Sequence, residues 1–300
     1  MNQEQEEPVL ELTDWLNTWR NAQGTPPPLF HYTDADGLRG IINSGSLWAT
    51  HIDYLNDSQE FKHAYGLINS IIDGLLGGEQ NQTTVRLRLI KDWFQRHFIL
   101  WRAVLAPYVV CFCEKGNLLS QWRAYAADGS GFSLEFDPGR LMQGLSSNGP
   151  DVFPNIKLFK AVYDESEQKR LILLALEQLL AAFDSHRQED VLGWVPLVFS
   201  EMNVCFKHPA FAEEQEWRLV YMARGAEHLV NVRVSHDRLL PFASLPFCAQ
   251  NERPPYTSIG YGPTLDPRNT KRAIEMLIGK ANPYWNTVDV VGSDAPFRSR

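Results

Sequence analysis

Segments with strand-like and helix-like patterns follow one another along this chain without a regular alternation. Residues 108–113 and 131–136 are rich in β-branched and aromatic side chains, whereas 58–76 and 83–105 carry apolar residues at helical spacing. A doubly wound parallel sheet would need a regular order of strand and helix. The irregular order therefore predicts an α+β fold, with a mostly antiparallel or mixed central sheet and helical insertions packed around it.

The first 27 residues are predicted to stand apart as a helix and a connector. Trp15 and Trp19 lie four residues apart, on one face of a helix over 10–21, and a Pro-rich stretch at 24–28 ends that helix. We expect residues 28–300 to form a single α+β domain, with helical insertions at about 58–105 and 165–204.

Within that domain the opening segment predicts strand, helix and strand in close succession. Residues 28–33 are strand-like, Asp34 is placed to cap a helix over 35–44, and Gly45 is placed to end it. Further along, a buried strand is expected at 108–113. Two later strands are expected to pair with each other, at 214–221 and 229–234.

Charge and cysteine content exclude several broad classes. A net charge of -8 opposes general adhesion to nucleic acid or anionic lipid, which requires clustered Lys and Arg. The longest apolar runs fall short of a membrane span. Four scattered Cys and an acidic start do not resemble a secreted disulfide scaffold. A cytoplasmic protein without membrane association is expected.

Common catalytic motifs are absent from the sequence. It contains no phosphate-binding Gly loop, no Gly-x-Ser-x-Gly elbow and no His-Glu-x-x-His pair. Cys111 and Cys113 share one face of a strand, but a zinc site requires further ligands, and Cys205 and Cys248 show no paired spacing. We therefore expect buried apolar thiols and no metal.

The segment 213–218, with the sequence Glu-Glu-Gln-Glu-Trp-Arg, carries the most information about function. If it enters a strand, Glu214, Glu216 and Arg218 share one face and Trp217 faces the other side. One interpretation is a solvated strand face with a weak ion pair between Arg218 and Glu216. The other is a carboxylate held at a cleft, where it stabilises positive charge that develops on a sugar.

Three other groups of residues are candidates for a site, and each also has a structural explanation. His31 alternates with two aromatic residues in the first strand and could simply be a satisfied structural histidine. Asn56 and Asp57 are typical of a turn and a helix cap. Trp122 and Tyr125 could belong to the core.

Taken in order, these residues resemble a bacterial family known as domain of unknown function 2971. The similarity extends over most of the chain, and its segments are Phe30–Thr33, Leu38–Leu47, Asn56–Asp57 with Glu60, Cys111–Phe112, Trp122, Tyr125, Gly131–Phe136, Lys207, 214–218 and Ser293–Arg298. The chain departs from the family pattern at Ser58, where Pro is usual, at Cys113, where Ser is common, and at Gln121, where Met is frequent.

The opening strand and helix are also similar to the first motif of the ADP-ribosyltransferase-like superfamily. That resemblance implies that His31 contacts a ribose of NAD, that Glu216 contacts the nicotinamide-ribose hydroxyl, and that Tyr125 or Tyr54 stacks on nicotinamide. Glu214 would orient an acceptor group or water. The other residues that it implies near the nucleotide are Tyr32, Thr33, Asn56, Asp57, Trp122, Arg123 and Arg218.

Three hypotheses follow from these resemblances. The first is an NAD-dependent ADP-ribosyltransferase or NAD glycohydrolase, a bacterial stress, toxin or phage-defence effector that uses NAD as substrate, needs no metal and transfers to a protein or nucleic-acid acceptor. The second is a non-catalytic regulatory module that binds a nucleotide or a protein. The third is an enzyme acting on nucleic-acid ends or bases, whose basic lining would include Arg39, Arg123 and Arg218.

Overall fold

The computed structural model describes residues 23–55, 60–78, 80–104, 107–149, 156–222, 230–235, 238–249, 252–263 and 266–296. The chain divides into two compact units. Unit 1 comprises Met1–Gly24, Ile52–Pro107 and Phe159–Glu213, and unit 2 comprises Thr25–His51, Tyr108–Leu158 and Glu214–Arg300. Each unit therefore combines segments that are far apart in the sequence. The helix expected over 10–21 lies outside the described residues.

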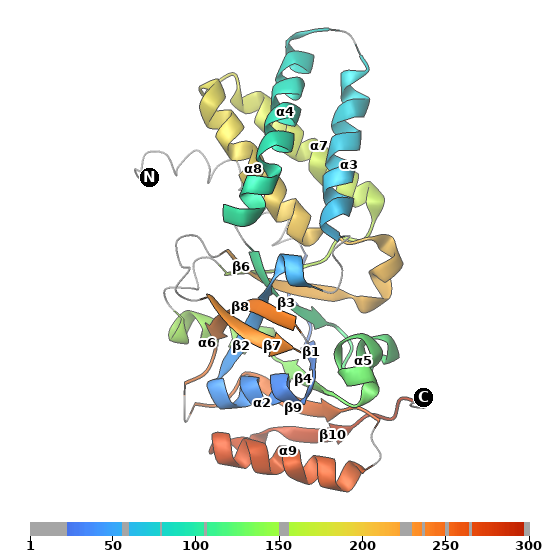
Figure 1. Ribbon diagram of the computed structural model, residues 1–300, viewed down its shortest axis with the longest axis vertical. Helices are drawn as coiled ribbons and strands as arrows, with labels where there is room; N and C mark the ends of the chain where they lie inside the picture. The colour runs from blue at the N-terminus through green and yellow to red at the C-terminus, as the bar shows by residue number, and fades with distance from the viewer. Residues whose placement is uncertain are drawn as a thin grey trace. The chain divides into compact units, whose positions relative to one another are not determined.

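The strands form an open, mixed and mostly antiparallel sheet, and most of their residues belong to unit 2 (Figure 1). Its main path has the strand order β10-β9-β4-β1-β3-β2-β8-β7, while β6 pairs with β3 and β5. The strands are β1 (Leu29–Thr33), β2 (Ser46–His51), β3 (Pro107–Cys113), β4 (Phe132–Phe136), β5 (Ile156–Lys160), β6 (Glu216–Met222), β7 (Val230–Ser235), β8 (Arg238–Pro246), β9 (Tyr256–Tyr261) and β10 (Asp289–Gly292). The predicted α+β class with a mixed sheet is confirmed.

Short helices accompany the sheet of unit 2. Helix α2 packs against β2 and α9, α5 against β1, and α6 against β8. Asp34 caps α2 by accepting a hydrogen bond from the Gly37 N–H at 2.7 Å, and Gly45 ends it with a φ of 60°. Both signals are recognisable in the sequence. The helices are α2 (Ala35–Ser44), α5 (Leu119–Tyr125), α6 (Pro138–Asn148) and α9 (Pro267–Ala281).

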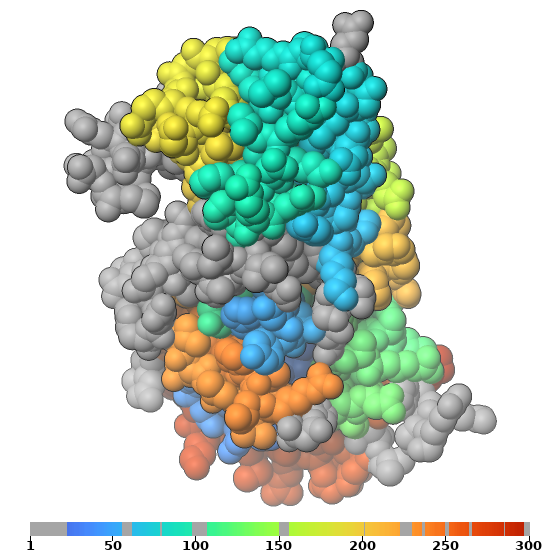
Figure 2. All heavy atoms as spheres, turned by 45° about the horizontal axis from the view of Figure 1, so that its top comes forward, coloured from blue at the N-terminus to red at the C-terminus, as the bar shows by residue number. Residues whose placement is uncertain are grey.

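The pairing expected between residues 214–221 and 229–234 is wrong. Strand β6 pairs with β3 and β5, whereas β7 forms an antiparallel pair with β8. Strand β8 contains Pro241 and Pro246, and prolines within a run weaken its strand signal, so the true partner of β7 was overlooked. The resulting β7–β8 hairpin, orange in Figure 2, reaches the surface with Val232, Val234 and Leu239 exposed.

In its described residues, unit 1 is a group of four long helices that pack on one another: α3 (Glu60–Leu76), α4 (Gln82–Val104), α7 (Glu165–Ala182) and α8 (Gln188–Cys205). Ile68, Ile72 and Ile90 are fully buried, and the rings of Phe94 and Phe199 lie 5.0 Å apart. The helical spacing read at 58–76 and 83–105 therefore corresponds to real helices. No helix in the described part of the chain has the length and hydrophobicity needed to cross a membrane.

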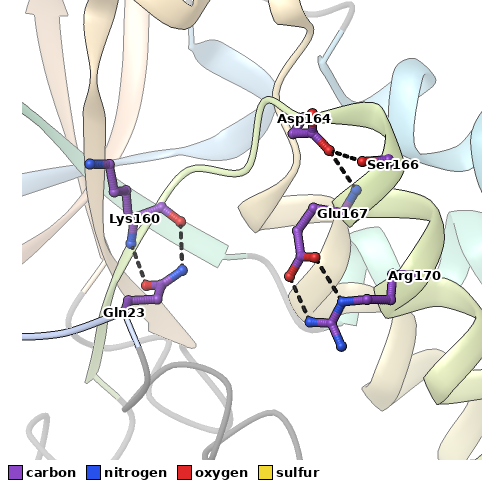
Figure 3. A network of polar contacts seen from close by, with 6 residues as sticks. All are labelled: Gln23, Lys160, Asp164, Ser166, Glu167 and Arg170. Atoms are coloured by element: carbon purple, nitrogen blue, oxygen red, sulfur yellow. Dashed lines mark hydrogen bonds and ion pairs between the residues drawn. The ribbon is translucent and has the colours of Figure 1, made fainter.

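Polar contacts fix the start of α7 (Figure 3). Asp164 is the N-cap, and its carboxylate accepts a hydrogen bond from the Glu167 N–H at 2.8 Å. One turn on, Arg170 pairs with the Glu167 carboxylate through two bonds of 2.7 Å. Ahead of the helix, the Gln23 side-chain amide donates to the Lys160 carbonyl oxygen and accepts from the Lys160 N–H.

Candidate functional site

Strand β3 is the meeting point of the strands that carry the candidate residues. Strand β1 pairs with one end of β3, at Cys113, and β2 pairs with the other end, at Tyr108 and Val109. Strand β6 pairs with β3 as well. The strand of His31 and the strand that begins at Glu216 therefore both border the same central strand.

The His31 side chain contacts the middle of β3, between the points where β1 and β2 pair with it. Its Nδ1 lies 2.9 Å from the Cys111 carbonyl oxygen, and its ring meets the edge of Phe112 at 5.8 Å. Because a carbonyl oxygen can only accept, Nδ1 carries the proton and Nε2 is an acceptor in the neutral ring. Burial lowers the imidazole pKa, and this effect outweighs the hydrogen bond to Cys111, which raises the pKa. The positive charge of Arg233 lowers the pKa further. His31 is therefore a neutral side chain near pH 7.

Tyr32 and Trp122 are core residues that fix the loop after β3. The Tyr32 hydroxyl donates to the Lys115 carbonyl at 2.7 Å and accepts from the Leu118 N–H at 3.0 Å. Its ring meets that of Trp122 edge-on at 5.0 Å. Burial raises the pKa of the Tyr32 phenol. Both side chains are almost fully buried, and so is Thr33, so in this structure they support the site as core residues.

The segment 213–218 differs from the expected strand. Glu214 ends the 3-10 helix Pro209–Glu214, and β6 begins only at Glu216, because Gln215 adopts a positive φ of 44° between them. Glu214 therefore does not share a strand face with Glu216 and Arg218. It lies near Cys113 instead, where burial and, to a smaller extent, the Glu214 charge raise the thiol pKa to about 11.

Glu216 and Arg218 form a buried ion pair. Arg218 Nε donates to Glu216 Oε1 at 2.9 Å and Nη2 donates to Oε2 at 3.1 Å. The side chains are 5% and 1% exposed. The expectation of a solvated strand face is wrong, since this face of β6 is covered by protein. Bidentate hydrogen bonding of this kind offsets much of the desolvation free energy lost by burying both charges.

The remaining predicted residues are distributed differently. Tyr125, on α5, is half-buried and packs on the cluster that contains Tyr32, Cys113 and Trp122. Arg123 lies on the same helix and is exposed. Tyr54 is exposed and belongs to unit 1. Asn56 and Asp57 lie outside the described residues.

Arg233 was not identified from the sequence, although its positive charge contributes to the lowered pKa of His31. Its Nη2 donates to the Thr50 hydroxyl at 3.0 Å, and its guanidinium carbon lies 5.7 Å from the centre of the Trp48 ring. The only available signal was the alternation in β7, which places Asn231, Arg233 and Ser235 on one face. Sequence alone does not tell which strand that face meets.

Of the three arginines expected to form the basic lining of a nucleic-acid enzyme, Arg123 and Arg39 are exposed and Arg218 is not. Arg39 is exposed and pairs with Asp36, three residues away, at 3.1 Å. Arg218 is buried against Glu216. Within the described ranges, no group of three or more His, Cys, Asp or Glu side chains is arranged to hold a metal ion.

Residues 121–219 match the model of a family described as protein of unknown function, DUF2971. The matched segment contains Trp122, Tyr125, Glu216 and Arg218, and it leaves out His31 and the C-terminal segment that the sequence resemblance had included. No curated protein and no solved structure matches the chain.

Proposed function

We propose that the chain cleaves NAD, as an ADP-ribosyltransferase or an NAD glycohydrolase of the ADP-ribosyltransferase-like kind. The proposal rests on the observation that β1, which carries His31, and β6, which begins at Glu216, both pair with β3. In this reaction the bond between nicotinamide and ribose breaks, positive charge develops on the sugar, and water or an acceptor group forms the new bond. A carboxylate and a ribose-binding residue are the groups that such a step requires.

His31 has the properties of a ribose-binding residue. Its Nδ1–H is held by the Cys111 carbonyl, which fixes the ring and leaves Nε2 as an acceptor for a sugar hydroxyl. A neutral imidazole also adds no positive charge next to the developing cation. Tyr125 is half-buried on α5 and carries an aromatic ring of the kind that can stack on nicotinamide.

Glu216 sets a condition on this mechanism. Both of its oxygens accept from Arg218, and the residue is 4% exposed. Contact between Glu216 and a ribose therefore requires local opening of the β6 region when substrate enters. The ion pair keeps the carboxylate ionised, which is the state that favours the developing charge.

The same ion pair favours a second candidate function, a non-catalytic module that binds a nucleotide or a partner protein. If Glu216 serves only to neutralise Arg218 inside the unit, the chain binds a ligand near His31 and leaves it intact. The two functions differ in one observable, the release of nicotinamide.

The test follows nicotinamide release from adenine-labelled NAD, with the purified chain alone and with a bacterial lysate. The NAD hypothesis predicts release by the wild type and a decrease of about a hundredfold in Glu216→Gln and in His31→Asn. An asparagine side chain at this position can still donate to the Cys111 carbonyl, so the His31→Asn variant removes the acceptor nitrogen with little change to the fold. Glu189→Gln, on the exposed face of α8, is the matched control and is expected to behave as wild type.

The outcomes separate the candidates. Label in protein or nucleic acid indicates transfer, and free ADP-ribose indicates hydrolysis. Binding of NAD by folded wild type without nicotinamide release supports the non-catalytic module. Release that is equal in wild type, Glu216→Gln and His31→Asn contradicts the proposed site.

A further inference from the structure

We infer that Arg233 is the phosphate-binding residue of unit 2, which receives a phosphate or diphosphate group of a nucleotide ligand. The inference rests on the proposed function only for the identity of that nucleotide. It is carried by the reach of the Arg233 side chain, by the way its guanidinium is held, and by a buried donor that it leaves unused.

The Arg233 side chain extends across the sheet. Strand β8 lies between β7 and β2, so the backbones of Arg233 and Thr50 are separated by two strand spacings, about 10 Å. Thr50 is the register partner of Phe242, and Phe242 is the partner of Asn231, which places Thr50 on the face of Asn231 and Arg233. The side chain spans this distance and bonds to Thr50.

The guanidinium is held from two directions. The Thr50 hydroxyl accepts one hydrogen bond, and the Trp48 ring lies beneath at cation–π distance. Trp48 is itself fixed, because its ring lies 5.1 Å from that of Phe242 and against Gly40, where a Cβ atom would come within 2.3 Å of the indole. A planar cation fixed in this way is preorganised for an oxyanion.

Arg233 has more N–H donors than the hydrogen-bond acceptors that the described residues offer to it. An arginine carries five N–H groups, and the hydroxyl of Thr50 accounts for one. Its Nε is buried and has no hydrogen-bond partner among the described residues. Burial lowers the Arg233 pKa, and the negative charge of Asp34 raises it. The Asp34 carboxylate, however, is already engaged as the cap of α2. An oxyanion would supply acceptors that the described residues of unit 2 do not.

The location agrees with a nucleotide site. The charge of Arg233 extends to His31, where it contributes to the lowered imidazole pKa. A ligand with a ribose at His31 and a diphosphate at Arg233 would therefore use two groups that already interact electrostatically. Arg233 is half-buried and thus open to solvent in part, unlike Arg218.

The experiment is isothermal titration of the full chain with pyrophosphate, ADP and NAD in turn. The wild type is expected to bind pyrophosphate and ADP. Arg233→Gln should weaken both by at least about tenfold, as expected for hydrogen bonds to a charged group. Arg233→Lys should be intermediate, because it retains the charge and loses the planar fork. Arg238→Gln, exposed on the same hairpin, is the matched control and should bind as wild type.

Thr50→Val provides a second test that leaves the arginine in place. It removes the acceptor that positions the guanidinium and should weaken ADP binding less than Arg233→Gln does. Partial retention of binding in Arg233→Lys together with loss in Arg233→Gln would identify charge recognition, since a purely structural role would not follow the charge.

The outcomes also separate this inference from the proposed function. Arg233-dependent binding of pyrophosphate or ADP without any NAD cleavage supports the inference and contradicts the proposed function. NAD cleavage that is unchanged in Arg233→Gln, or wild type that binds neither pyrophosphate nor ADP, overturns the inference. Preference for ADP over pyrophosphate would assign the phosphate to a nucleotide, and equal affinity would assign it to the free anion.

Discussion

Arg218 and Arg233 lie on strands of the same unit, and their guanidinium groups have opposite surroundings. Arg218 is 1% exposed and is bound through two hydrogen bonds to Glu216. Arg233 is half-buried, bonds once to a neutral hydroxyl and keeps a buried Nε without a partner among the described residues. The Arg218 guanidinium is therefore paired with a carboxylate inside the fold, whereas the Arg233 guanidinium keeps N–H donors that a ligand could use. A positive charge alone therefore does not indicate a binding residue, whereas hydrogen-bond donors left without acceptors do.

The largest effect on stability is expected from breaking the buried ion pair between Glu216 and Arg218. Arg218→Met leaves the Glu216 carboxylate buried without its partner, and we expect it to lower the free energy of unfolding by about 3–5 kcal/mol. Chemical denaturation measures this value. The double variant Glu216→Leu with Arg218→Met removes both charges and should lose less than the single variant. A loss below about 1 kcal/mol in Arg218→Met would show that the pair does not stabilise the fold.

Arg233→Met should change the free energy of unfolding much less, by no more than about 1 kcal/mol. The variant loses one hydrogen bond, but it also relieves the burial of a charge that has no carboxylate partner within bonding distance among the described residues. The same denaturation experiment compares it directly with Arg218→Met. If the two variants were equally unstable, Arg233 would be structural and the contrast would fail.

A smaller, pH-dependent effect is expected at His31. Its pKa is below the ordinary value of 6.5 in the folded chain, so as the pH falls below about 6.5 the unfolded chain binds a proton there and the folded chain does not. Wild type should therefore lose stability relative to His31→Asn as the pH falls from about 7.5 to about 5.5. Unfolding midpoints of both proteins across this range provide the measurement.

The contribution of Arg233 to that effect can be isolated. Its positive charge is one cause of the lowered His31 pKa, so in an Arg233→Met background the stability difference caused by His31→Asn should vary less with pH. An increase in stability of wild type relative to His31→Asn on acidification would contradict the assigned neutral state.

The smallest effect is expected from Asp34→Asn. Asparagine caps a helix as well as aspartate, so the free energy of unfolding should change by less than about 0.5 kcal/mol. Removing the negative charge near Arg233 should strengthen pyrophosphate binding by a few-fold, which titration calorimetry detects. Weaker binding in this variant would show that Asp34 does not oppose an anion at Arg233.

Local signals in the sequence were sufficient for much of the fold. The Asp34 cap, the Gly45 stop and the apolar spacing of α3 and α4 act within a few residues of one another, so they could be recognised without knowing the tertiary structure. The partners of β6 and β7 are set by contacts far apart in the sequence. The prolines of β8 concealed one of those partners.

The candidate site shows the same division. His31 was identified from its place in the first strand, and Glu216 from its charged segment, but the left-handed Gln215 that separates Glu214 from β6 left no sequence signal. Arg233 was missed because its proposed role in phosphate binding depends on Thr50 and Trp48, which lie far earlier in the chain and are brought to it by the order of strands in the sheet.

We propose that unit 2 binds a nucleotide between His31 and Arg233, and a crystal structure of the chain with ADP-ribose bound would test this binding mode. We predict a diphosphate oxygen within hydrogen-bond distance of the Arg233 guanidinium and a ribose hydroxyl that donates to His31 Nε2. ADP-ribose bound at any place that leaves both side chains untouched would contradict the claim.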